Sequence, residues 1–235
     1  MNINQLFQDL SFGELSTLSL AQDGNGYITD AGKERLIRFA NDGMLKLYGR
    51  FVLKESELLI EQVEWITNYH LILKFAESQM ATGDQDYYYI KDLPAEPFKD
   101  DVIRILKVYD VSGCELKLND DANPFSLFTP QANVLQVPNP VGGAPLAVTY
   151  QAKPAPLVLN EALDQEIELP DVLHAALRNW IAYRCFGQVK TQESMAAAAD
   201  HLAQFEGACA EVITYDLVGN TTSQTNNRFA LNGWA

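Results

Sequence analysis

The residues that most resemble a ligand-binding motif lie between positions 21 and 32. Residues 23–29 read Asp-Gly-Asn-Gly-Tyr-Ile-Thr and match the centre of a calcium-binding EF-hand loop. With Gly26 at the sixth loop position, the first position is Ala21 and the twelfth is Gly32, so the first carboxylate and the closing glutamate are absent. The sequence therefore favours a glycine-rich turn before a helix, with calcium binding as the alternative.

Histidines and paired carboxylates are the next candidates for chemistry. His70, His174 and His201 lie in one expected strand and two expected helices, and no metal-ligand spacing joins them. We interpret His174 as a packing or interface residue rather than a base. Residues 100–101 and 120–121 are both Asp-Asp pairs, which are typical of solvated loop ends. A catalytic or metal-binding role for these pairs is the alternative.

Aromatic residues offer a third kind of site. Tyr87, Tyr88 and Tyr89 could stack on a sugar or a base, but strand alternation makes at least one of them a core residue. These tyrosines could equally form part of an interface with another protein. The nucleophile-elbow, phosphate-loop and dinucleotide-binding glycine patterns do not occur in the sequence. We therefore expect neither an enzyme nor a cofactor or metal site.

Composition and charge limit the class of protein. The 235 residues fit one large domain or two small ones, and a 47% hydrophobic, 10% aromatic composition predicts a folded chain with a sizeable core. The sequence carries 31 acidic and 17 basic residues, for a formal net charge of −14. This charge argues against a surface that grips nucleic acid by neutralising phosphates. It is compatible with a channel through which DNA slides.

Cysteine content and hydropathy indicate the cellular compartment in which the protein assembles. Cys114, Cys185 and Cys209 are too few and too scattered for a disulfide framework, which fits assembly at a reducing, cytosolic site. The sequence has no basic-then-apolar leader and no run approaching ~20 apolar residues. We therefore expect neither a signal peptide nor a membrane span.

Helical patterns open the sequence. Apolar residues at helical spacing predict a first helix over residues 3–10, and Ser11 followed by Glu14 fits a capping box for a second short helical turn. A longer helix is expected to begin near Thr29 or Asp30. The apolar stripe of this helix comprises Leu36, Ile37, Ala40, Met44, Leu47 and Tyr48.

The middle of the sequence has a strand-like pattern from Glu57 to about Tyr150. It predicts a β region of about 90 residues between helical ends, and therefore an α+β protein. A glycine turn at residues 111–113 predicts a hairpin, and Pro130 is expected to separate two short strands. The last strand should stop at Pro154. The expected strands are 58–63, 69–75, 87–90, 102–110, 115–118, 126–129, 133–137 and one that begins at 146.

Two helices are expected near the C-terminal end. The first should begin at Pro170 and end at Gly187, with an apolar side that comprises Leu173, Ala176, Leu177, Trp180, Ile181 and Phe186. Thr191 should cap the second. Its apolar residues recur at spacings of 3, 4, 3, 4 and 3: Met195, Ala198, Leu202, Phe205, Cys209 and Val212. This repeat predicts packing on the preceding helix rather than an independent coiled coil.

The final residues form an unusual arm. From Asn220 the sequence becomes polar and loses periodicity, yet it ends with Phe229, Leu231 and Trp234. A solvated tail has no reason to carry these apolar side chains. We therefore expect the arm to become ordered on a neighbouring protein, with a frayed terminus as the alternative.

One combination of patterns is typical of a known family. A strand ends in Tyr-x-Ala-x-Pro at residues 150–154, an acidic spacer follows, Leu-Pro occupies 169–170, and the next helix ends in Tyr-Arg-x-Phe at 183–186. This combination resembles the head-to-tail adaptor (connector) proteins of tailed bacteriophages. The similarity extends more loosely over most of the sequence.

The resemblance implies a structural virion protein at the head–tail junction. It implies a homo-oligomeric ring of about twelve copies, with the portal protein and a tail tube or nozzle protein as partners. DNA would pass through the ring without sequence-specific binding. Tyr183 and Arg184 of the Tyr-Arg-x-Phe pattern then join Phe229, Leu231 and Trp234 as expected interface residues.

Together these patterns predict a four-part organisation. Residues 1–50 and 151–219 would form a helical bundle, residues 51–150 an inserted antiparallel β region, and residues 220–235 an extended C-terminal arm. The alternative function is a tail or receptor-binding module that uses the β region to bind a carbohydrate or a fibre.

Overall fold

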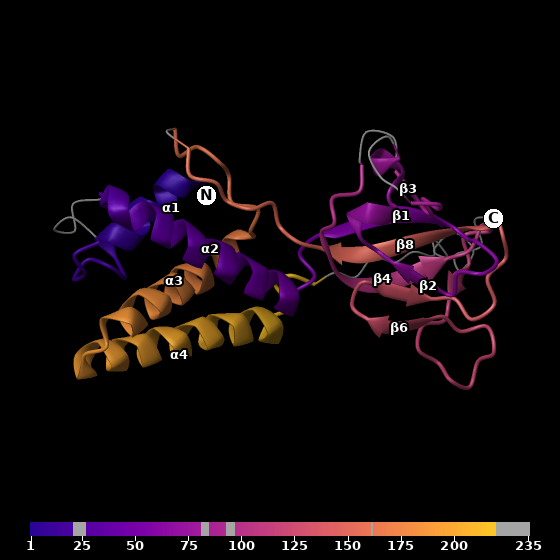
Figure 1. Ribbon diagram of the computed structural model, residues 1–235. Coiled ribbons are helices and arrows are strands. Elements are labelled where there is room, and N and C mark those ends of the chain that lie inside the picture. Colours follow the sequence, from indigo (N-terminus) through magenta and orange to yellow (C-terminus); the bar gives the residue numbers. More distant parts are fainter. Residues whose placement is uncertain (21–26, 81–84, 93–96, 161, 220–235) are drawn as a thin grey trace, which may run out of the picture. The chain divides into compact units, whose positions relative to one another are not determined.

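The computed structural model describes residues 1–20, 27–80, 85–92, 97–160 and 162–219 (Figure 1). These residues form two compact units. The helical unit takes residues 1–40 and those from 159 on, and the β unit takes residues 41–158. The predicted α+β class, with helices from both ends of the sequence and inserted antiparallel strands, is confirmed. The four-part division at residues 50, 150 and 219 stays a prediction.

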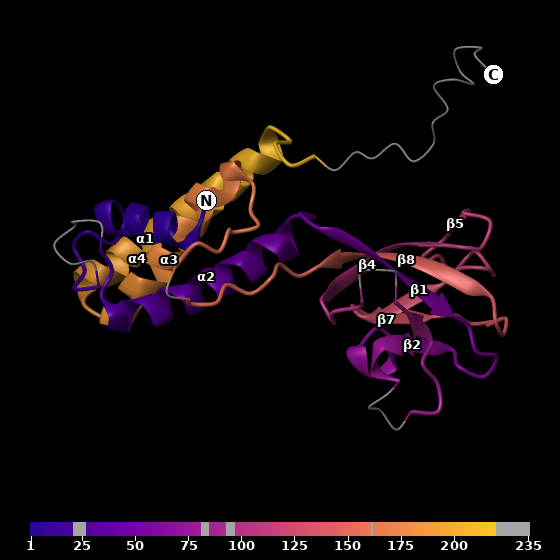
Figure 2. The same cartoon turned by 90° about the horizontal axis from the view of Figure 1, so that it is seen from above.

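The helical unit is built around a pair of neighbouring helices. Helices α3 (His174–Val189) and α4 (Gln192–Thr214) lie side by side, and α1 (Ile3–Phe12) packs against α3 (Figures 1 and 2). Helix α2 (Asp30–Arg50) begins where the sequence predicts, and the division between the units falls within it, after Ala40. The predicted apolar residues of α1 are all buried: Ile3, Leu6, Phe7 and Leu10.

Helix α1 begins at the predicted residue, but the capping box lies at its start rather than at Ser11. Asn2 and Gln5 form a capping box, in which the Gln5 backbone N–H donates to Asn2 Oδ1 at 2.8 Å and the Asn2 N–H donates to Gln5 Oε1 at 3.0 Å. The predicted capping box of Ser11 and Glu14 is wrong. Because α1 continues to Phe12, Ser11 lies inside the helix, where its side chain is buried.

Helices α3 and α4 confirm one predicted cap and correct another. The Ser194 N–H donates to Thr191 Oγ1 at 3.2 Å, so Thr191 caps α4 as predicted. The predicted end of α3 at Gly187 is wrong, because the helix continues to Val189 and Lys190 takes the left-handed conformation, with φ 57°. Its predicted start is also shifted, since a 3-10 turn over Asp171–Leu173 precedes the α-helix.

The predicted apolar faces of α3 and α4 are largely confirmed. The predicted α3 side is buried throughout, as are Ala198, Phe205, Cys209 and Val212 on α4. Met195 and Leu202 depart from the prediction, because Met195 is 56% exposed and Leu202 is only half-buried. Asn179, which does not belong to the predicted apolar side of α3, is also buried, and its side-chain amide donates to the Ala175 carbonyl at 3.0 Å.

The β unit contains two antiparallel sheets. The first has the order β3-β1-β8-β4-β5 and the second the order β2-β7-β6. The strands are β1 (Glu55–Glu61), β2 (Asn68–His70), β3 (Ile90–Lys91), β4 (Val102–Tyr109), β5 (Glu115–Leu116), β6 (Phe128–Gln131), β7 (Val134–Gln136) and β8 (Pro145–Ala152). Strand β8 lies at the centre of the first sheet, with β1 paired from Glu55↔Gln151 to Glu61↔Pro145.

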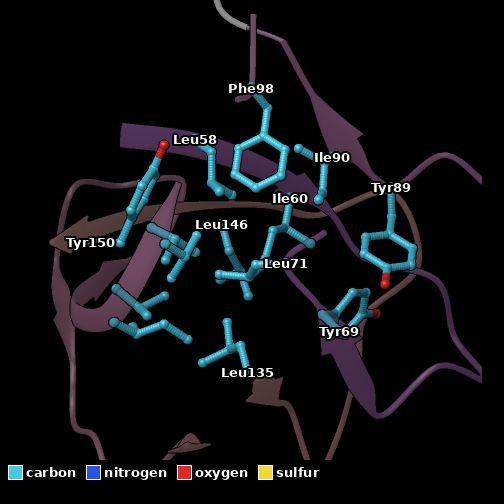
Figure 3. Close-up of a cluster of buried hydrophobic side chains, with 14 of the residues drawn as sticks. Leu58, Ile60, Tyr69, Leu71, Tyr89, Ile90, Phe98, Leu135, Leu146 and Tyr150 are labelled. Atoms are coloured by element: carbon cyan, nitrogen blue, oxygen red, sulfur yellow. The ribbon is translucent and has the colours of Figure 1, made fainter. Parts of the chain in front are cut away.

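One hydrophobic core joins the two sheets. Tyr69 and Leu135 from the second sheet belong to the same buried cluster as Ile60 and Leu146 from the first (Figure 3). Tyr69 packs edge-on against Tyr89, with ring centroids 5.0 Å apart. The alternating side chains of both sheets thus stabilise each other by excluding water from this cluster.

Three predicted strands need correction. The strand expected over 69–75 ends at His70, and Leu73–Phe75 forms a 3-10 turn. In the stretch expected over 87–90 only Ile90 is in a strand, and the Tyr89 hydroxyl bonds to the backbone of His70 at 2.9 and 3.0 Å. Pro130 lies within β6 rather than between strands, at an irregularity in the pairing where a proline is tolerated.

Strand β8 supplies a buried polar anchor. It ends before Pro154, as predicted, but the face with Thr149 and Gln151 is buried as well. The Gln151 side-chain amide donates to the carbonyls of Tyr48 and Phe51, and the Arg104 Nε–H donates to Gln151 Oε1 at 2.7 Å. This amide therefore connects β8 to carbonyl groups at and just beyond the C-terminal end of α2, the end of a helix where carbonyls accept bonds from outside it.

The hairpin predicted at residues 111–113 is also present. Strands β4 and β5 pair across it, and Gly113 adopts φ 76°, which a side chain would disfavour.

Candidate interaction surfaces

The paired carboxylates take part in local structure. The Tyr150 hydroxyl donates to Asp101 Oδ1 at 2.9 Å, and the Ala122 N–H donates to Asp120 Oδ1 at 3.1 Å. Within the described ranges, no group of three histidine, cysteine or acidic side chains is placed to hold a metal ion. The calcium-like run at residues 23–26 lies outside the described residues. Over those same ranges, no helix has both the length and the apolar character needed to cross a bilayer.

Two histidines are held inside the helical unit. His174 Nε2 lies 3.1 Å from the Leu169 carbonyl, and His201 Nδ1 lies 2.9 Å from Asn179 Oδ1. Burial lowers the pKa of both imidazoles below the ordinary value for histidine. Both side chains therefore favour the neutral form in the folded protein, in keeping with a packing role.

Tyr183 and Arg184 lie in an aromatic cluster of the helical unit. The Arg184 guanidinium lies over the rings of Phe39 and Trp180, at 4.9 and 5.9 Å from their centroids. The Tyr183 ring lies 5.4 Å from that of Trp180. Both residues are partly exposed, so the cluster combines internal packing with an accessible edge. An interface role for Tyr183 and Arg184 stays a prediction.

The C-terminal arm begins beyond an exposed apolar segment. Ile213, Tyr215 and Leu217 are 58, 67 and 50% exposed at the end of α4. Phe229, Leu231 and Trp234 lie outside the described residues, so their interface role also stays a prediction.

The β unit exposes a pair of aromatic rings. Trp65 and Tyr87 pack edge to face, with centroids 5.7 Å apart, and are 67 and 42% exposed. The Tyr87–Tyr89 run indicated an aromatic site, and Tyr89 is its core member, with 3% exposure. Trp65 could not be assigned to this site from the sequence, because nothing local indicates that residues 22 positions apart pack together.

An apolar pocket is the second surface feature of the β unit. It has a volume of about 210 Å3 and lies between the loop at residues 124–127 and the loop at residues 137–141. Phe125 and Val141 stand on its rim with 82 and 64% of their surfaces exposed. Its floor includes core side chains of the sheets: Leu116, Leu127, Val137 and Leu146. The sequence analysis did not identify this pocket, because its residues come from six separate stretches.

Three of the four polar side chains that line this pocket, all but that of Asn139, already bond to backbone groups. Gln62 Oε1 accepts the Val141 N–H at 3.0 Å, and Asp110 Oδ1 accepts the Ser112 and Cys114 N–H groups at 2.8 and 2.9 Å. The Ser126 hydroxyl bonds to backbone groups of its own loop. The pocket therefore offers mainly apolar contact to a ligand.

Comparison with known proteins identifies one related family. The profile of a family described as SU10 adaptor protein matches residues 11–228, which include most of both units. Among curated proteins, none matches this sequence.

Proposed function

Because the chain belongs to the SU10 adaptor protein family, we propose that it forms a ring that joins the portal to the tail of a bacteriophage. The family is one of structural phage adaptors, so the protein is a virion component that contacts other virion proteins. The ring, its position at the portal-to-tail junction and a stoichiometry of about twelve copies are parts of the proposal.

The observation that carries the proposal is the extent of the family match. Residues 11–228 include helices α2, α3 and α4 and the whole inserted β unit, so the match is not limited to a shared helical hairpin. A local motif would support only a common fold element. A match of this length supports the shared role of the family.

The helical unit has the rigidity that a ring subunit needs. Arg178 on α3 donates to Asp9 on α1 and to Glu14, each at 3.0 Å, and so ties the N-terminal segment to the C-terminal helices. Repetition of one contact around a closed ring requires that each subunit presents the same surfaces in the same geometry. We propose that Tyr183 and Arg184 contribute to such a surface.

The acidic surface of α4 supports a channel through which DNA passes without being bound. Helix α4 has no lysine or arginine and carries Glu193, Asp200, Glu206 and Glu211, all of them exposed. Acidic surfaces repel the phosphate backbone, so DNA would pass without specific binding. The net charge of −14 also favours separate subunits before assembly, which then form a ring on the portal.

Reconstitution with portal oligomers tests the proposal. We expect purified protein to bind the portal and to give a closed ring of one discrete mass, measured by native mass spectrometry and imaged by electron microscopy. A protein that stays separate from the portal at all concentrations would contradict it. The Arg184→Glu variant tests the proposed interface: it should assemble poorly on the portal while retaining its helical content.

The exposed Trp65–Tyr87 pair supports a second candidate function. Exposed aromatic rings provide flat apolar faces on which sugars and protein side chains pack. The β unit would then bind a carbohydrate or a tail fibre. Glycan-array binding that is lost in Trp65→Ala would favour this function, provided that it is retained in the control variant Val158→Ala, which changes a similarly exposed residue.

A further inference from the structure

We infer that the apolar pocket of the β unit binds the segment Phe229–Trp234 of a neighbouring copy. The inference rests on the proposed ring and specifies which surface receives the arm. It connects two features that the family role leaves unexplained, namely a pocket with an exposed apolar rim and a polar arm with an apolar end.

The size of the pocket suits a single large side chain. Its volume of about 210 Å3 exceeds the ~150 Å3 of an engineered cavity that binds benzene. A phenylalanine ring or the larger part of an indole would therefore fit between Phe125 and Val141. Both rim residues would lose exposed apolar surface on binding, which favours the bound state.

The chemistry of the pocket excludes a polar ligand as its best occupant. Of its four polar lining residues, Asp110 and Ser126 bond to backbone groups near them in the sequence, Gln62 accepts the Val141 N–H, and Asn139 is exposed. A sugar would need several hydrogen-bonding partners that the pocket does not offer. An apolar peptide side chain needs none, so the pocket favours a segment such as Phe229–Trp234.

The pocket is also held in shape before binding. Asn123 Oδ1 accepts the Phe125 N–H at 2.9 Å, and the Asp120 N–H donates to the Ser126 hydroxyl at 3.0 Å. These bonds fix the loop that presents the Phe125 ring, and Pro124 limits the backbone of this loop further, as Pro138 does in the loop at residues 137–141. A preorganised pocket loses little conformational freedom when a ligand binds.

The arm has the length and charge for this role. Phe229 follows the last described residue, Gly219, by ten positions, so an extended spacer would span roughly 33 Å at ~3.3 Å per residue. This reach is comparable to the diameter of a small domain. Residues 220–235 contain no acidic residue and one arginine, Arg228, whereas the whole sequence has a net charge of −14. An arm without acidic residues avoids repulsion by an acidic neighbour.

Photo-cross-linking of the full-length protein tests this inference. The variant Trp234→p-benzoylphenylalanine would be prepared in 14N and 15N forms, mixed, and irradiated both on portal oligomers and as concentrated protein alone. We expect cross-links from position 234 to residues 124–141, in peptide pairs that combine the two isotopes. Cross-links within one copy, to the portal or to another surface would overturn the inference, as would their absence from both samples.

Two matched substitutions strengthen the test. Val141→Ser removes an apolar side chain from the rim, and Val111→Ser removes one that is 76% exposed but does not line the pocket. We expect Val141→Ser to lower the cross-link yield about tenfold, as the loss of one buried aliphatic contact would. Val111→Ser should leave it unchanged. An equal effect of both substitutions would reject the pocket as the binding site.

The mass of the complex and the position of the cross-links test the ring and the pocket separately, so that either proposal can fail while the other stands. A ring on the portal with position 234 cross-linked elsewhere would contradict the pocket and leave the ring intact. Pocket cross-links between copies that never form a ring on the portal would instead support the pocket and contradict the ring.

Discussion

The rings of Trp180 on α3 and Phe205 on α4 lie 5.3 Å apart, centroid to centroid, at an angle of 54°. Phe205 has no exposed surface. We expect Phe205→Ala to lower the free energy of unfolding by roughly 3–5 kcal/mol, because it leaves a cavity between the two helices. Met195→Ala, at an exposed position of the same helix, should change it by less than about 1 kcal/mol. Urea unfolding measures both, and similar values for the two variants would contradict the helix pairing.

Gln151 should be the most sensitive polar residue of the β unit. Gln151→Leu would remove the hydrogen bonds to the Tyr48 and Phe51 carbonyls and to the Arg104 side chain, each contributing about 0.5–1.5 kcal/mol. We expect a clear loss in thermal stability. The control Gln131→Leu, at an exposed position of β6, should melt like the unsubstituted protein.

Acidification should destabilise the helical unit through its histidines. Burial lowers the pKa of His174 and His201 in the folded state, so the unfolded chain binds more protons as the pH falls below about 6.5. The stability gained by keeping both rings neutral is present above that pH and is lost below it. Between about pH 7.5 and pH 5.5, the double variant His174→Gln/His201→Gln should lose less unfolding free energy than the unsubstituted protein. An equal loss would show that other groups control the pH dependence.

Cysteine reactivity should report the burial of the helix pair. Cys114 is exposed, whereas Cys185 and Cys209 are buried, and burial raises the pKa of the Cys185 thiol to about 12. A thiol reagent should label Cys114 rapidly and the other two only on unfolding. Cys114→Ser should abolish the rapid phase. Rapid labelling of two or more thiols in the native protein would contradict this packing.

Calcium should leave stability unchanged. The run at residues 23–29 lacks the first and last ligands of an EF-hand, and a ligand that does not bind cannot shift the folding equilibrium. Thermal melts with millimolar calcium and with chelator should overlay. A rise of several degrees with calcium would show that the loop supplies ligands in a different register.

The features that the sequence by itself determined are those with a local cause. Helical spacing identified the buried sides of α1 and α3, Thr191 capped α4 through a residue three positions away, and the glycine turn at 113 produced the β4–β5 hairpin. In each case the interacting groups lie within about one turn of helix or one tight turn of chain. Residue type and spacing are then sufficient to predict the structure.

Tertiary structure alone decided the rest, because the groups involved are distant in sequence. Gln62 and Val141 are 79 positions apart, and Gln151 is 100 positions from Phe51, yet these pairs form the pocket and anchor α2. The ring of Trp65 became half of an aromatic pair only when the chain brought Tyr87 beside it. Sequence periodicity records which residues avoid water, but not which of them meet, since that choice depends on how the strands pair and how their side chains fill one core.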